Sequence, residues 1–275
     1  MIIVGDSIAE GLGVAGCSYA DLLREGVGES GRERAEVKNL AYTAFQISDS
    51  SRLLPEIVQD RPDVMIVAHG ITEALLRPPA AALRFVPPSW REKGGMDPRP
   101  YFSRRLVKRL GQKLKSAVRW RVKNLLMRRF GQAVWTEQAL FEAQTHDFIH
   151  TLLAETEARI VLLTHCGIDD RFFPGSSEAL ERYKAGLQRI AAEEAATRRV
   201  FLCDVSQALD RWDDFFADHF HPNAQGHAKI ARAIAALLQP PPRPAGSGER
   251  PENRQKANGA VPGRPILSVS RAREH

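Results

Sequence analysis

The chain has 275 residues, of which 43% are hydrophobic and 26% are charged, enough for one sizeable α/β domain with further segments. No stretch of 18 apolar residues exists, so the sequence excludes a membrane-spanning helix. The first residues lack the basic region and cleavage site of a signal peptide. Three cysteines without C-x-x-C spacing argue against a disulfide framework and a structural zinc site, so a cytoplasmic protein is expected.

The positive charge is concentrated in one segment. Residues 77–129 hold 16 Lys or Arg against two acidic residues, Glu92 and Asp97. The segment therefore has a formal charge of +14. Because the whole chain has a formal net charge of +6, the other residues together carry −8. A cationic feature localised in this way indicates an anionic partner or substrate.

Short apolar runs alternate with helical patterns along the chain. The apolar runs are nearly continuous, which is typical of parallel strands covered on both faces. The alternation predicts a three-layer α/β/α sandwich around a five-stranded, flavodoxin-like parallel sheet. In chain order, the predicted elements are a strand at 2–4, a helix at 19–25, a strand at 37–40, a helix at 50–59, a strand at 64–68, a helix at 143–157, a strand at 160–164, a helix at 177–196, a strand at 200–203 and a helix at 224–238.

The third and fourth predicted strands are separated by an unusually long segment. About 90 residues lie between them, whereas a plain strand–helix–strand crossover needs roughly 30. We predict a basic insertion at 77–145, rich in Pro and Gly at first and helical over 103–130. The α/β domain then covers residues 1–238, and the Pro- and Arg-rich residues 239–275 are predicted to form a disordered tail.

Two short polar blocks carry the chemistry. Ser7 follows the first predicted strand in Gly5-Asp6-Ser7, at the strand end where ligand sites of such sheets form. Near the other end of the chain, Asp218 lies three residues before His221, so its carboxylate can hold the imidazole while the other ring nitrogen activates Ser7. A simpler interpretation stays open, in which Ser7 or Asp6 only caps the first helix, and His221 and Asn223 only cap the last one.

Two further histidines, His219 inside this last block and His227 after it, make a metal site conceivable. No matching acidic or cysteine cluster accompanies them. We therefore expect no metal and no organic cofactor.

Together, Gly5-Asp6-Ser7 and Asp218-x-x-His221-Pro222-Asn223 resemble the SGNH hydrolases, the GDSL-type lipase/esterase family. The resemblance implies that Ser7 is the nucleophile, that His221 is the general base and then acid, and that Asp218 orients His221. It also implies an oxyanion hole built from the N–H of Ser7, the N–H of Ala44 and a donor from the loop after the third strand.

This sequence departs from the family pattern at two of the oxyanion positions. Ala44 stands where the family has Gly, and a backbone N–H survives that change unless the backbone requires positive φ. The family's Gly-x-Asn-Asp block appears as Gly70-Ile71-Thr72-Glu73, and losing one oxyanion donor typically costs about 10²–10³ in rate. Either Thr72 substitutes for the Asn, His69 or a basic residue supplies the charge, or the enzyme is slow. We predict substrate contacts for Asp6, His69, Gly70 and Glu73.

The expected function is that of a serine esterase acting on a small acyl or acetyl group of a larger polar or anionic molecule, through an acyl-enzyme. The same triad would serve an acyltransferase. The alternative from a different class is a non-catalytic anion- or polysaccharide-binding protein on the same scaffold. The expected partner is a small-molecule or glycan ester, and the oligomeric state stays open.

Three interpretations compete for the basic residues 99–129. They form a solvated cationic face, or a lid that binds an anionic substrate or lies on an acidic membrane surface, or a nucleic-acid surface. The membrane alternative would make the protein peripheral at a membrane. Nucleic acid is the least favoured partner, because the sequence contains no recognised binding module.

Overall fold

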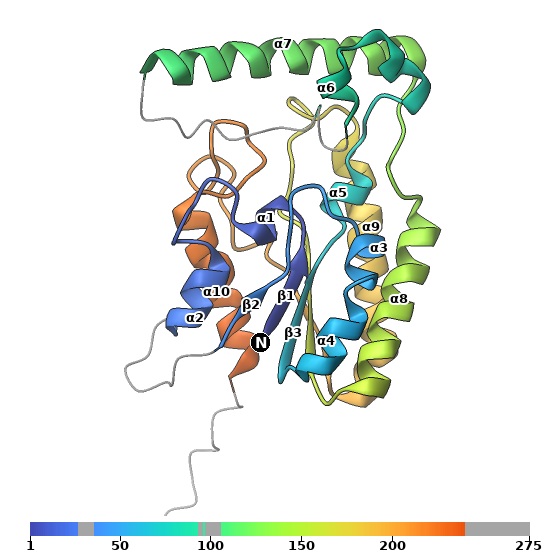
Figure 1. The fold of residues 1–275 in the computed structure, drawn as a ribbon, viewed down its shortest axis with the longest axis vertical. Coiled ribbons are helices and arrows are strands. Elements are labelled where there is room, and N and C mark those ends of the chain that lie inside the picture. Colours follow the sequence, from blue (N-terminus) through green and yellow to red (C-terminus); the bar gives the residue numbers. More distant parts are fainter. Residues whose placement is uncertain (27–35, 93–95, 97–105, 240–275) are drawn as a thin grey trace, which may run out of the picture. The chain divides into compact units, whose positions relative to one another are not determined.

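A five-stranded parallel sheet forms the centre of the computed structural model, which describes residues 1–26, 36–92, 96 and 106–239 (Figure 1). The strand order is β2-β1-β3-β4-β5, and all neighbouring strands are parallel. This is the flavodoxin-like order, so the predicted fold class is confirmed. The strands are β1 (Ile2–Gly5), β2 (Lys38–Asn39), β3 (Val64–Ala68), β4 (Arg159–Leu163) and β5 (Val200–Cys203).

Alternate residues of each strand pack against opposite helix layers, because side chains alternate between the two faces of a sheet. In β3, Ile66 faces one layer, whereas Met65 and Val67 face the other. Burial on both faces explains why the strands have continuous apolar sequences. One layer holds α2 (Tyr19–Glu25) and α10 (Ala224–Leu238), and the other holds α3 (Ile47–Ser51), α4 (Leu54–Asp60), α8 (Gln138–Glu155) and α9 (Ser176–Glu193) (Figure 1).

The predicted helices differ from the observed ones at three places. Where one helix was predicted at 50–59, the structure has two, α3 and α4. The break comes before Pro55, which lies in the first turn of α4, a position where the missing N–H of Pro removes no helix hydrogen bond. Helix α8 begins five residues before the predicted start, and its Phe141 is fully buried in the main core. Helix α9 ends at Glu193 and is followed by a 3-10 turn, η2 (Glu194–Thr197).

The insertion is closed at its base by Arg77 and Ala133. Their backbones pair as an antiparallel bridge with N···O distances of 2.9 and 2.8 Å. The guanidinium of Arg77 lies over the ring of Trp135 at 3.6 Å. The predicted span of 77–145 therefore includes the first turns of α8, which pack in the main core. Within the insertion lie η1 (Ala80–Phe85), α6 (Pro88–Arg91) and α7 (Leu106–Phe130).

Helix α7 crosses the edge of the molecule at which the strands end, above α1 (Ser7–Glu10) and α5 (Ile71–Ala74) (Figure 1). It packs with η1 and α6 in a small separate core that includes Ala82, Val86 and Leu126. Its first predicted residues, 103–105, and the tail beyond Gln239 lie outside the described residues. None of the helices in the described ranges is long and apolar enough to cross a bilayer.

Candidate active site

Ser7 stands at the end of β1, as the first residue of the short helix α1 (Ser7–Glu10). The carboxylate of Asp6 caps this helix by accepting the N–H of Ile8 at 2.9 Å. Gly5 is required before it, because a Cβ at this position would meet the carbonyl oxygen of Ala68 at 2.6 Å. The lack of a side chain at Gly5 thus lets β1 and β3 approach closely where Ser7 leaves the sheet.

The three residues predicted as a triad form a continuous chain of hydrogen bonds. Ser7 Oγ lies 2.9 Å from His221 Nε2, and His221 Nδ1 lies 2.7 Å from Asp218 Oδ2. All three side chains are buried. A proton on Nδ1 satisfies Asp218 and leaves Nε2 as the acceptor for the Ser7 hydroxyl. This is the arrangement in which a histidine can remove the proton of a serine.

The loop before α10 holds Asp218 and His221 in this geometry. Asp218 Oδ1 accepts the N–H groups of Phe220 and His221, each at 3.1 Å. Asn223 caps α10 by accepting the N–H groups of the next turn, so the capping interpretation is correct for Asn223. His221 instead points to Ser7, and its interpretation as a helix cap is wrong.

Ala44 lies in the loop between β2 and α3 and has the left-handed backbone conformation, with φ of +64°. This region is unfavourable for residues with a Cβ, which explains why the family prefers Gly here. Within the described ranges, the N–H of Ala44 has no hydrogen-bond partner. The Ala44 N–H is therefore not engaged by the described residues, its left-handed backbone is strained, and its role as an oxyanion donor stays a prediction.

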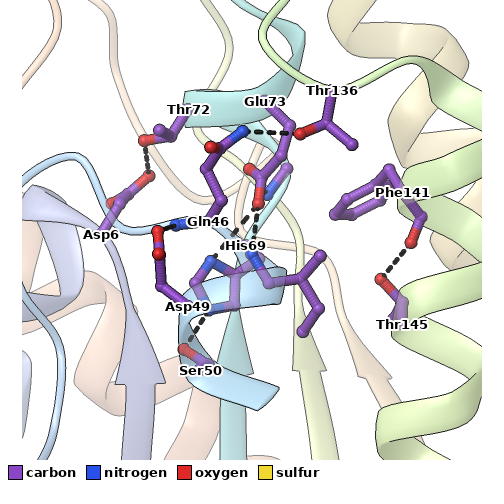
Figure 2. Close-up of polar contacts among 12 residues, drawn as sticks. Asp6, Gln46, Asp49, Ser50, His69, Thr72, Glu73, Thr136, Phe141 and Thr145 are labelled. Carbon is purple, nitrogen blue, oxygen red and sulfur yellow. Dashed lines mark hydrogen bonds and ion pairs between the residues drawn. The ribbon is translucent and has the colours of Figure 1, made fainter. Parts of the chain in front are cut away.

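Thr72 lies in α5 (Ile71–Ala74), directly after β3. Its hydroxyl donates to Asp6 Oδ2 at 2.8 Å, as Figure 2 shows. Burial raises the pKa of the Asp6 carboxyl above its ordinary value, while hydrogen bonds from Ile8 and Thr72 act in the opposite direction. The single hydroxyl hydrogen of Thr72 is thus used within the protein, whereas an Asn amide at this position would offer two.

Glu73 ties the loop after β3 to the start of α3. Its two carboxylate oxygens accept the N–H groups of Ile47 and Gly70 at 2.7 and 2.9 Å (Figure 2). Burial raises its pKa to about 7, although these hydrogen bonds favour the charged form. His69 lies beside it, with Nδ1 3.6 Å from Glu73 Oε1 and Nε2 2.8 Å from Ser50 Oγ.

These contacts lie within the protein, and substrate contact by Asp6, His69, Gly70 and Glu73 stays a prediction. All four residues are buried, and their polar groups bind other parts of the chain. Gly70 has φ of +123° and allows the sharp turn from β3 into α5. Asp6 and Glu73 support the segments around Ser7 by accepting the backbone N–H groups of Ile8, Ile47 and Gly70. Their burial could not be read from their positions after the strands.

A cavity of about 300 Å³ lies between α7 and the loop that carries Asp218. Its apolar walls include Met127 and Phe173, and Asp218 is the triad residue in its lining. Trp120 of α7 closes one side by donating from Nε1 to the carbonyl oxygen of Phe172 at 2.6 Å. Arg171, Phe172 and Phe173, which follow β4 in the chain, also line the cavity. The contribution of Trp120 was missed, because only the fold brings α7 to this edge of the sheet.

The described residues include one group of three side chains that are close enough to share a metal ion. His146, His150 and Glu194 lie on α8 and η2, with ligand atoms within 4.8 Å of one another. The predicted alternative at His219 and His227 is not part of it. His227 Nδ1 accepts the N–H of Tyr19 at 3.2 Å, and burial lowers its pKa to about 4.

Solved structures with the same fold are esterases and acylhydrolases. An acetyl xylan esterase, AlAXEase, shares 15% identity, with a TM-score of 0.56 over 87% of this chain and 100% of that one. A lipase/acylhydrolase from Enterococcus faecalis shares 16% identity, with a TM-score of 0.55 over 86% and 94%. Axe2, an acetylxylan esterase from Geobacillus stearothermophilus, shares 16% identity, with a TM-score of 0.54 over 86% and 91%. Among curated proteins, no sequence matches the chain.

The sheet order and these likenesses define a flavodoxin-like α/β fold that several esterases share. The sequence also matches the model of the GDSL-like lipase/acylhydrolase family over residues 3–229. The chain therefore belongs to this family and is a hydrolase, so the resemblance inferred from the two polar blocks is confirmed.

The left-handed backbone of Ala44 predicts how substitutions there will act. Ala44→Gly should leave the free energy of unfolding within about 1 kcal/mol, because relief of strain offsets the greater freedom of Gly in the unfolded chain. Ala44→Val should lower it by about 2 kcal/mol, because β-branched residues tolerate positive φ poorly. Urea denaturation checks both values, and equal stability of the two variants would contradict a required left-handed conformation.

The raised pKa of Glu73 predicts a pH-dependent stability. Between the ordinary value of 4.5 and the folded value of about 7, the folded state binds a proton that the unfolded state has lost. Stability should therefore fall as pH rises through this window, by at most about 3 kcal/mol. Glu73→Gln cannot ionise, so its free energy of unfolding, measured in urea over the same window, should have a smaller slope. The same slope in both proteins would rule out Glu73 as the source.

Proposed function

We propose that this hydrolase is a serine esterase that cleaves a carboxylic ester through an acyl-enzyme formed on Ser7. The observation that carries the proposal is the hydrogen-bonded chain from Ser7 Oγ through His221 to Asp218. Ser7 Oγ attacks the ester carbonyl while its proton passes to His221 Nε2. The carboxylate of Asp218 stabilises the imidazolium that forms, and its backbone hydrogen bonds keep it in place.

The second half of the reaction uses the same groups. The imidazolium gives its proton to the departing alcohol, which leaves Ser7 acylated. Water then attacks the acyl-enzyme, its proton passes to His221 Nε2, and the acid is released as Ser7 recovers its hydrogen. No metal or organic cofactor takes part in the proposed steps.

The oxyanion would be held mainly by the backbone N–H groups of Ser7 and Ala44. The Thr72 hydroxyl can serve as a third donor only after turning away from Asp6, to which it now donates. The site thus has a weaker third donor than an Asn would supply, and one oxyanion donor is worth about 10²–10³ in rate.

The proposed substrate carries a small acyl or acetyl group on a larger polar or anionic molecule. Two structures of the same fold are named as acetylxylan esterases, which supports an acetylated glycan as one such molecule. Arg119 and Lys123 in the lining of the cavity favour an anionic group near Asp218, whereas Arg171, also in the lining, is ion-paired with Asp169 at 2.6 Å. We propose on the same basis that the insertion is a lid over the site, since residues of α7 form one wall of that cavity.

Two alternatives use the same scaffold. An acyltransferase would need an alcohol in place of water and the same triad. A non-catalytic anion- or polysaccharide-binding protein is supported by the loss of the oxyanion Asn at Thr72. It is opposed by the 2.9 Å contact between Ser7 and His221, which binding alone does not require.

Replacement of Ser7 tests the esterase. Ser7→Ala should lower the hydrolysis of p-nitrophenyl esters by about 10⁴-fold or more, because the acyl-enzyme can no longer form. The series from acetate to decanoate should show its highest kcat/KM at the short acyl groups. Ser51→Ala is a matched control, since Ser51 Oγ only donates to the carbonyl oxygen of Ile47 in α3.

Two outcomes of this assay would contradict the proposal. A Ser7→Ala variant as active as the wild type would exclude Ser7 as the nucleophile. A wild-type protein inert toward every ester in the series would favour the binding-protein alternative.

A further inference from the structure

Helix α7 carries a row of exposed apolar side chains along one side. The row occupies positions three, four or seven residues apart, which places its members on one face of a helix. Their exposed fractions lie between 43% and 87%. Soluble proteins seldom leave such a contiguous apolar row uncovered. We call this row the α7 stripe, and it consists of Val107, Leu110, Leu114, Val118 and Leu125.

The same helix is strongly cationic. Its 25 residues include nine Lys or Arg and no Asp or Glu. Long basic side chains beside an apolar row can lay their methylene groups along it and keep the charge in the headgroup region of a membrane. The exposed members of this basic flank are Lys108, Lys113, Lys115, Arg121, Arg128 and Arg129.

The opposite face of α7 is fixed to the body of the protein. Leu126 packs in the small core of the insertion, and Met127 lines the cavity near Asp218. Trp120 donates to the carbonyl oxygen of Phe172. Among the described residues, the α7 stripe therefore packs in no hydrophobic core, and Figure 1 shows α7 at the outer edge of the described part of the chain.

We propose that the α7 stripe and its basic flank dock α7 flat on the surface of an anionic lipid bilayer. The leucines and valines would enter the headgroup boundary, and the Lys and Arg side chains would bind anionic headgroups. The helix is about 37 Å long, so it offers an extended contact. A positive helix without acidic residues matches any anionic surface. An exposed apolar row matches a lipid interface but not a polyanion in solution, so the two features together favour a membrane.

Docking would also bring the active site to the lipid surface. The inner face of α7 lines the cavity that reaches Asp218, so a substrate that leaves the membrane would arrive beside the triad. This part rests on the proposed esterase and points to an ester carried by an anionic amphiphile. The docking itself does not depend on catalysis.

Vesicle binding by the full chain tests the proposal. The protein should bind vesicles of phosphatidylcholine and phosphatidylglycerol in equal parts, and much less to phosphatidylcholine alone. Replacing Lys113, Lys115 and Arg121 by Gln should weaken binding about 100-fold, because each positive charge that is removed lowers the affinity by roughly a factor of five. Leu110→Gln with Leu114→Gln should weaken it by about tenfold or more. Added salt should weaken binding through the basic flank.

Matched controls lie on other helices. Leu140→Gln and Arg232→Gln remove an exposed leucine from α8 and an exposed arginine from α10, and both should bind as the wild type does. Ser7→Ala should also bind normally, which separates failure of docking from failure of the proposed esterase. All substituted positions on α7, α8 and α10 are exposed, so the melting temperature of these variants should stay close to that of the wild type.

A site-specific probe distinguishes insertion from simple charge attraction. In a Cys17→Ser background, which removes the exposed native thiol, Leu114→Cys labelled with an environment-sensitive dye should become brighter and blue-shifted on anionic vesicles. The same label at Leu140→Cys should not respond. Absence of vesicle binding would overturn the proposal. If the Lys113, Lys115 and Arg121 variant lost binding, the Leu110 and Leu114 variant kept it, and the dye did not respond, the proposal would also be overturned. That result would favour a surface that binds polyanions, such as nucleic acid, by charge alone.

Discussion

The hydrogen bond between Ser7 Oγ and His221 Nε2 is the contact on which the site depends, and it joins residues 214 positions apart. Parallel strands direct their carboxyl ends to one edge of the sheet, so β1 and the loop before α10 can meet there. Gly5 allows β1 to lie close to β3, and Asp218 holds both the backbone and the ring of His221. Loss of any of these supports would misplace one end of the hydrogen bond.

Beneath this contact lies a buried polar layer in which the family's oxyanion Asn has been replaced. Buried polar groups lower stability unless they are paired. Here the Asp6 carboxylate accepts a hydrogen bond from the Thr72 hydroxyl, and the Glu73 carboxylate accepts hydrogen bonds from two backbone N–H groups. The layer fixes the turn at Gly70 and the start of α3, and thus the loop that contains Ala44. In the proposed oxyanion hole, the Thr72 hydroxyl is therefore engaged with Asp6, while the bond from the Ile47 N–H to Glu73 supports the segment next to Ala44.

The sequence predicted those features that follow from local pattern. Residues 64–68 and 200–203 form strands with the predicted bounds because both faces of the sheet are buried and the apolar runs are continuous. Features that depend on distant parts of the chain were not predictable. The left-handed conformation of Ala44, the burial of Glu73, and the wall that Trp120 adds to the cavity all arise from packing between segments far apart in sequence. Pro55 did carry a local signal for the break between α3 and α4.

The central claim is that His221 activates Ser7, and fluorophosphonate labelling followed by peptide mapping tests it most directly. A serine that merely caps a helix does not react, whereas one activated by a histidine does. The account predicts that wild-type protein is labelled on Ser7 alone, and that His221→Gln, which keeps a polar side chain at this position, is labelled far more slowly. An unlabelled wild-type protein, or equal labelling of Ser7 in the two proteins, would contradict the account.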